Sequence, residues 1–178
     1  MDDINASFHR EDEKEWAEAH EKLRRRFNIT DLGATKYLLG MRITRDRTAR
    51  TITLDQELYV TKALEKFGLQ HLRPVSTPGM DQEDSTDSST GDEPTDLKSY
   101  QEKVGTLLYA AISVRPDIAY AVNKLCQKMT APTVRDAKAC DRVFRYLAGT
   151  KEAGLLFGRS NSSKGGPHVT VAAYADAD

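Results

Sequence analysis

The spacing of apolar and polar residues predicts three elements in the first half of the chain. Residues 12–26 have the composition of an amphipathic helix, with acidic residues early and arginines in the last turns, as a helix dipole favours. Two β-rich runs, residues 35–46 and 50–56, flank a polar connection and predict a β-hairpin. Residues 55–69 place apolar side chains at helical spacing and end at Gly68, a typical helix stop.

The second half has the pattern of three helices followed by two strands. Helical spacing or helix-start signals mark residues 95–114, 115–129 and 133–150. Residues 154–160 and 168–178 are β-rich and are joined by a Gly- and Ser-containing connection, which predicts a strand pair. The fold class expected is therefore α+β, with an N-terminal helix and β-hairpin, a helical middle and a C-terminal β-hairpin.

Charge divides the chain further. Residues 74–97 contain seven acidic residues and no Lys or Arg, so this polar segment is expected to be an acidic flexible loop. The whole chain has a net charge of −1, so the remainder is net positive. The expected divisions are residues 1–73, this loop, a helical region at 98–150 and the strands at 151–178.

Composition indicates the cellular location of the chain and the state of its cysteines. No apolar run is long enough for a membrane helix, and the first twenty residues lack the pattern of a secretory signal, so an intracellular location in the cytoplasm or nucleus is expected. Cys126 and Cys140 have neither CxxC spacing nor a histidine close in sequence. Neither a disulfide nor a zinc site is favoured, and both cysteines are expected to be small core residues.

One helix carries a stripe of cations. Arg135, Lys138, Arg142 and Arg145 recur at steps of three, four and three, which places them on one side of the helix at 133–150. Such a stripe suits a phosphate backbone, because each contact adds salt-sensitive affinity. A solvated helix face explains the same pattern, and the residues alone leave both interpretations open.

The preceding helix carries a glycine at its middle. Gln101, Gly105 and Tyr109 are spaced by four and lie on one helix face. Glycine inside a helix costs about 1 kcal/mol relative to alanine, so a reason for it is expected. Close packing by a neighbouring helix is the more common reason. The alternative is that the helix backbone lies against a nucleic-acid minor groove, with Gln101 reading base acceptors and Tyr109 packing on a sugar.

Carboxylates gather near both ends of the sequence. Asp2 and Asp3 are adjacent, and Asp176 and Asp178 follow a strand-like run. Paired carboxylates can bind a divalent cation, but two ligands do not complete a magnesium site, and aspartates near a terminus are normally solvated.

Several segments, taken in order, resemble a known family. They are "FNITDLGATKYLLGMRITRD", "ITLDQELYVTKALEKFGL", "PVSTPG", "YQEKVGTLLYAAISVRPDIAYAVNKLCQKMTAPT" and "RVFRYLAGTKEAGLLF". Together they resemble the reverse-transcriptase region of copia-type LTR retrotransposon polyproteins, and the resemblance covers nearly the whole chain. It implies the end of a polymerase palm, a thumb and connection, and the first strands of a ribonuclease H.

The resemblance implies roles for two groups of binding residues. Leu39 and Gly40 match the hairpin that holds the primer terminus in such polymerases. Gln101, Gly105 and Tyr109 match thumb-helix positions that track the minor groove, which favours the nucleic-acid interpretation of this face over helix packing.

The resemblance also implies remnants of catalytic sites. Asp2 and Asp3 match the paired carboxylates of the palm, and Asp176 matches the first catalytic carboxylate of ribonuclease H. The parent family is an RNA-directed DNA polymerase that uses Mg²⁺. Such an enzyme has fingers and most of its palm before Asp2, so this chain is expected to be a truncated or domesticated fragment that is catalytically incomplete and needs no cofactor of its own.

Three functions follow as hypotheses. The first is salt-sensitive binding of an RNA/DNA hybrid or duplex nucleic acid, with no membrane role. The second is a co-opted protein-interaction module that binds a protein partner or forms a homodimer and has no nucleic-acid role. The third is an enzyme subunit that complements separately supplied fingers and palm.

Overall fold

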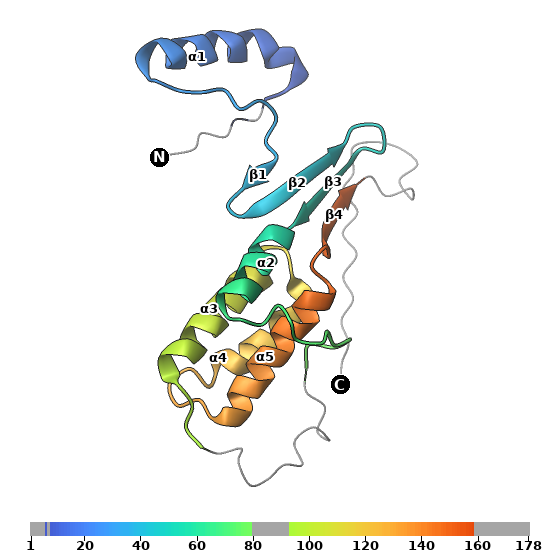
Figure 1. Ribbon diagram of the computed structural model, residues 1–178. Helices are drawn as coiled ribbons and strands as arrows, with labels where there is room; N and C mark the ends of the chain where they lie inside the picture. The colour runs from blue at the N-terminus through green and yellow to red at the C-terminus, as the bar shows by residue number, and fades with distance from the viewer. Residues whose placement is uncertain (1–5, 7, 80–92, 159–178) are drawn as a thin grey trace. The chain divides into compact units, whose positions relative to one another are not determined.

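The protein has the expected α+β fold. The computed structural model describes residues 6, 8–79 and 93–158 (Figure 1). By its internal contacts the chain divides into two compact units, Met1–Lys36 and Tyr37–Asp178. No helix in the described parts of the chain is long and apolar enough to cross a membrane.

The first unit contains one helix. A 3-10 turn at Arg10–Asp12 leads into α1, Glu13–Arg26, which confirms the helix predicted at 12–26. Its apolar side is only half covered, because α1 has no buried residue. Trp16 stacks between Phe8 and His20, with ring centroids 5.3 Å and 5.5 Å apart.

The second unit begins with an antiparallel sheet in the order β1-β2-β3-β4. Its strands are β1, Tyr37–Leu38; β2, Met41–Asp46; β3, Thr51–Asp55; and β4, Gly154–Gly158. The pairing of β2 with β3 confirms the hairpin predicted from the sequence. The first predicted run, residues 35–46, is not one strand, because a turn at Leu39 and Gly40 divides it into β1 and β2. The positions of β1 and β4 at the two edges come from the fold rather than from the local pattern.

β4 joins the two halves of the sequence. Its residues pair with β3 in antiparallel register, with Leu54 opposite Leu155. The strand that the sequence predicts as its hairpin partner, at 168–178, lies outside the described residues. The first expected hairpin is therefore extended by a strand about 100 residues later in the chain.

The sheet continues into a bundle of helices (Figure 1). β3 runs into α2, and α5 runs into β4. The helices are α2, Glu57–Lys66; α3, Leu97–Ser113; α4, Ala119–Cys126, entered through a 3-10 turn at Pro116–Ile118; and α5, Val134–Gly149. Each corresponds to a helix that the sequence predicts.

Local signals set the helix ends. The Asp96 side chain accepts a hydrogen bond from the backbone N–H of Lys98 and caps α3. Thr133 and Asp136 form a reciprocal capping box at the start of α5. Gly68 follows α2 with φ +68°, a conformation that glycine adopts at little cost.

The core of this unit lies between the four helices. Its buried side chains include Leu64 of α2, Leu107 of α3, Val122 of α4 and Phe144 of α5. Residues from both sides of the acidic segment thus share one core. Cys140 is fully buried in it, and the half-buried Cys126 packs against it, which agrees with the core role predicted for both.

The flanks of the acidic segment contact α5. Arg145 Nε donates to the Arg73 carbonyl oxygen at 2.8 Å, and Arg142 Nη2 donates to Thr77 Oγ1 at 3.0 Å. On the other flank, the Val134 N–H donates to the Glu93 carbonyl oxygen at 2.8 Å. Residues 80–92, which hold most of the acids, lie outside the described residues.

Candidate nucleic-acid interface

Tyr109 brings two of the sequence-predicted binding elements together. Its hydroxyl donates a hydrogen bond to the Leu39 carbonyl oxygen, across 70 residues of sequence. Its ring meets the Tyr59 ring edge-on, with centroids 5.2 Å apart. α3 is thereby fastened at Tyr109 to the turn between β1 and β2, which holds Leu39 and Gly40.

The β1–β2 turn has an unusual backbone. Leu39 and Gly40 are its two central residues, with φ of +49° and +72°. Two positive φ values are typical of a tight hairpin turn that follows the twist of its strands. Glycine adopts this conformation freely, but a leucine rarely does. Leu39 is also 72% exposed, and an exposed apolar residue in a strained turn is a reason to look for a function there.

Gly105 occupies an open position on α3. It is exposed, and a Cβ atom added to it would meet nothing within 4 Å. Within the described residues, close packing by a neighbouring helix therefore does not explain this glycine. The helix backbone is left accessible between Gln101, one turn before, and Tyr109, one turn after.

Gln101 lies on the same face of α3 as Gly105, one turn before it. Its side chain is exposed, and its Nε2 donates to the Met129 carbonyl oxygen at 2.9 Å, just beyond α4. This contact directs the amide nitrogen toward the segment that follows α4. The three residues predicted from their spacing thus share one face, but each of the two polar side chains also has a contact within the fold.

The predicted basic stripe on α5 divides into two pairs. Arg135 and Lys138 are exposed in the first half of the helix. Arg142 and Arg145 are half-buried, and both donate to the segment at 73–77. The first pair remains available to a partner, whereas the second pair has a role in holding the chain against α5.

Comparison with known proteins identifies relatives of the chain. It is 35% identical over 161 residues to the retrovirus-related Pol polyprotein from transposon TNT 1-94 of Nicotiana tabacum. It is also 35% identical over 158 residues to the retrovirus-related Pol polyprotein from transposon RE1 of Arabidopsis thaliana. These alignments cover 88% and 89% of the chain. The chain is homologous to one segment of copia-type retrotransposon Pol polyproteins.

The retrotransposon Pol homologue corresponds to a small part of these relatives. It spans 12% of the tobacco polyprotein and 10% of the Arabidopsis one. A shorter relative, an uncharacterised mitochondrial protein of Arabidopsis thaliana, is 33% identical over 153 residues, and the chain covers 59% of it. No family model matches the chain. No solved structure matches it either.

The predicted catalytic remnants are not placed by the structure. Asp2, Asp3 and Asp176 of the Pol homologue all lie outside the described residues. Among the residues that are described, no group of three or more His, Cys, Asp or Glu side chains could hold a metal ion. The use of Mg²⁺ that the resemblance implies for the parent family stays a prediction.

Sequence reasoning missed a cluster of four polar residues beside the turn: Arg42, Asp55, Gln56 and Glu57. Arg42 Nε donates to Asp55 at 3.0 Å, and Arg42 Nη2 to Glu57 at 2.8 Å. The hydrogen bond to Asp55 raises the pKa of Arg42, with a smaller contribution from the charge of Glu57. Gln56, between these two acids, is buried. In the sequence, the run "DQE" between a strand and a helix gives only a helix-start signal, so it does not reveal this cluster.

Proposed function

We propose that this retrotransposon Pol homologue binds an RNA/DNA hybrid or duplex nucleic acid through the exposed face of α3 and the β1–β2 turn. The observation that carries the proposal is the open position of Gly105 between Gln101 and Tyr109. A glycine without a packing partner costs helix stability, and close approach of a ligand to the helix backbone accounts for that cost.

The chemistry of this face supports a double-stranded ligand. The Gln101 amide has a second N–H besides the one that it donates to Met129, and this donor suits the acceptors that line a minor groove. Tyr109 holds the Leu39–Gly40 turn beside the helix, so one strand can contact the helix while its end reaches the turn. Arg135 and Lys138 add exposed positive charge elsewhere on the same unit.

The test is a titration of the full chain with a fluorescently labelled RNA/DNA hybrid, duplex DNA and each single strand. We expect the double-stranded ligands to bind more tightly than the single strands. Binding should weaken between roughly 50 mM and 200 mM salt, because phosphate contacts release counterions.

The variant Gly105→Leu tests whether binding uses the exposed face of α3 or only the attraction between opposite charges. The leucine side chain would fill the open position and keep the helix backbone away from a groove, so we expect about a tenfold loss of affinity, about 1.4 kcal/mol. Gln127→Leu, an exposed change on the Pol homologue beyond α4, is the matched control and should bind like the natural chain. Equal affinities of the two variants would refute the assigned surface.

Gly105→Ala supplies a stability readout for the same position. Because the added methyl group meets nothing, the change should raise the free energy of unfolding by up to about 1 kcal/mol, measured by urea unfolding. A lower stability would mean that the glycine serves the fold. In that case the open-face argument would fail independently of any binding result.

The edge strand β4 favours a second candidate function, binding of a protein partner. Leu156 and Phe157 are 69% and 52% exposed, and β4 is an edge of the described sheet. Exposed apolar residues on an unpaired edge are suited to strand addition. Light scattering over a range of concentrations tests self-association, which Phe157→Lys should then abolish. A monomer throughout that range would rule out the homodimer.

A further inference from the structure

The residues on either side of the acid-rich stretch, residues 80–92, are bound to α5. Before the stretch, Thr77 Oγ1 accepts a hydrogen bond from Arg142 Nη2 at 3.0 Å. After it, the Glu93 carbonyl oxygen accepts from the Val134 N–H at 2.8 Å. These two attachment points are eight residues apart on α5, which corresponds to about 12 Å along the helix axis.

Two exposed cations lie between the attachment points. Arg135 and Lys138 are on the same side of α5 as Arg142, because all three belong to one stripe at helical spacing. Both side chains are exposed, and within the described parts of the chain neither forms a hydrogen bond or an ion pair. This half of the stripe is therefore a cationic helix face without a described partner.

The acid-rich stretch has the opposite charge. Its sequence contains no Lys, Arg or His and five acidic residues: Asp81, Glu83, Asp84, Asp87 and Asp92. Thirteen residues can span about 40 Å when extended, more than the distance between the attachment points, so the length of this stretch lets its carboxylates reach either cation. A tether this short keeps them at a roughly millimolar effective concentration beside the helix.

We propose that carboxylates of the acid-rich stretch bind to Arg135 and Lys138 of the same chain and compete with nucleic acid for this face. Carboxylates and phosphates are recognised by the same cationic side chains, so binding of one excludes the other. The inference rests on the proposed binding of a hybrid or duplex and adds a regulation of that binding. The chain lowers the affinity of its own basic face for phosphate groups.

The first experiment uses the full chain without nucleic acid. A neutral acetylating reagent is added, and mass spectrometry follows the rate at each lysine. The neutral variant carries five substitutions of similar size: Asp81→Asn, Glu83→Gln, Asp84→Asn, Asp87→Asn and Asp92→Asn. Carboxylates that contact the Lys138 ammonium shield it from the reagent, so Lys138 should react about fivefold faster in this variant. Lys128, exposed just beyond α4, is the internal reference and should react equally in both chains.

The second experiment measures the affinity for the RNA/DNA hybrid at about 50 mM salt. The neutral variant should bind about fivefold more tightly than the natural chain, which corresponds to about 1 kcal/mol, the effect expected for two exposed ion pairs. The gain should shrink at about 200 mM salt, because exposed charges are screened.

A charge-matched control distinguishes this contact from the net charge of the chain. It removes five exposed acids of the first unit: Glu11→Gln, Asp12→Asn, Glu13→Gln, Glu15→Gln and Glu18→Gln. The control should gain less affinity than the neutral variant, and an equal gain would overturn the proposal. In a chain that also carries Arg135→Gln and Lys138→Gln, neutralising the acid-rich stretch should give no gain. A gain that survives there would place the contact elsewhere and would also overturn it.

The acetylation rates separate this inference from the function on which it rests. Equal Lys138 rates in the natural chain and the neutral variant would overturn the contact, whatever the hybrid result. A natural-chain rate that falls as the chain concentration rises would assign the carboxylates to a second copy and would overturn the intramolecular contact. Failure of every chain to bind the hybrid, with the Lys138 difference present, would refute the proposed function and the competition while the contact stands.

Discussion

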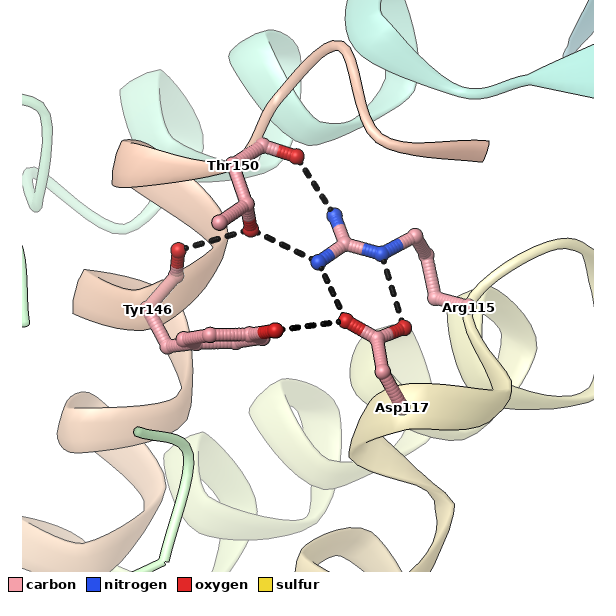
Figure 2. A network of polar contacts seen from close by, with 4 residues as sticks. All are labelled: Arg115, Asp117, Tyr146 and Thr150. Carbon is pink, nitrogen blue, oxygen red and sulfur yellow. Dashed lines mark hydrogen bonds and ion pairs between the residues drawn. The ribbon is translucent and has the colours of Figure 1, made fainter. Parts of the chain in front are cut away.

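Arg115 and Asp117 form a two-pronged ion pair at the entry to α4. Arg115 Nε donates to Asp117 Oδ1 at 3.0 Å, and Nη2 donates to Oδ2 at 2.7 Å (Figure 2). The same guanidinium donates to the Thr150 carbonyl oxygen at 2.8 Å and to Thr150 Oγ1 at 2.6 Å. Tyr146 completes the network by donating its hydroxyl to Asp117 at 2.9 Å. The junction of α3 and α4 is thus fastened to the point where the chain leaves α5 toward β4.

Loss of Arg115 should destabilise the protein strongly. Its side chain is 1% exposed, and Arg115→Met would leave the acceptors on Asp117 and Thr150 without their donor. Removing one partner of a buried ion pair costs about 3 to 5 kcal/mol, and the lower end applies because Asp117 is partly exposed. Urea unfolding measures the change. Arg47→Met, an exposed change in the β2–β3 turn, should shift stability by less than about 0.5 kcal/mol.

The Asp117 carboxylate should make this stability depend on pH. Burial acts to raise its pKa, but the hydrogen bonds from Arg115 and Tyr146 outweigh burial and hold the pKa below its ordinary value. A carboxylate with a lowered folded-state pKa contributes stability above its unfolded pKa, about 3.9, and loses it as the pH falls through the folded value. The stability difference between the natural chain and Asp117→Asn should therefore be largest near neutral pH and shrink below about pH 4. A difference that stays constant on acidification would contradict this assignment.

The two cysteines should differ in reactivity. Burial raises the pKa of the Cys140 thiol to about 12, so its reactive thiolate is scarce at mildly alkaline pH. Cys126 is half-buried. With a disulfide reagent on the native chain, we expect Cys126 to react first and Cys140 to react only on unfolding. Cys126→Ser should then remove the fast phase, whereas an unchanged fast phase in this variant would show that Cys140 is accessible.

The exposed half of the α5 stripe should govern the salt dependence of nucleic-acid binding. Arg135→Glu combined with Lys138→Glu should weaken binding and lower the salt slope by about 1 to 2, since each lost phosphate contact contributes about 0.9. Stability should change little, because both side chains are exposed. Arg145→Ala is the contrasting variant: it removes the bond to the Arg73 carbonyl oxygen and should mainly lower stability. An unchanged salt slope in the double variant would exclude this half of the stripe from binding.

Local sequence signals were sufficient to predict the helices and the first hairpin. Asp96 and Thr133 cap α3 and α5, and Gly68 follows the end of α2, as their positions beside apolar-periodic segments indicate. These features involve residues that are neighbours along the chain, so their energies depend little on distant parts. The spacing of Gln101 and Gly105 likewise predicts a shared helix face whatever packs around it.

The sequence could not determine the contacts between distant residues. The bond from Tyr109 to Leu39 and the pairing of β4 with β3 both join segments that only folding brings together. The division of the α5 stripe has the same origin, because a helical period fixes which side chains share a face but not what covers that face. The sequence by itself therefore determined the elements and the family, and tertiary packing decided which polar groups remain open to a ligand.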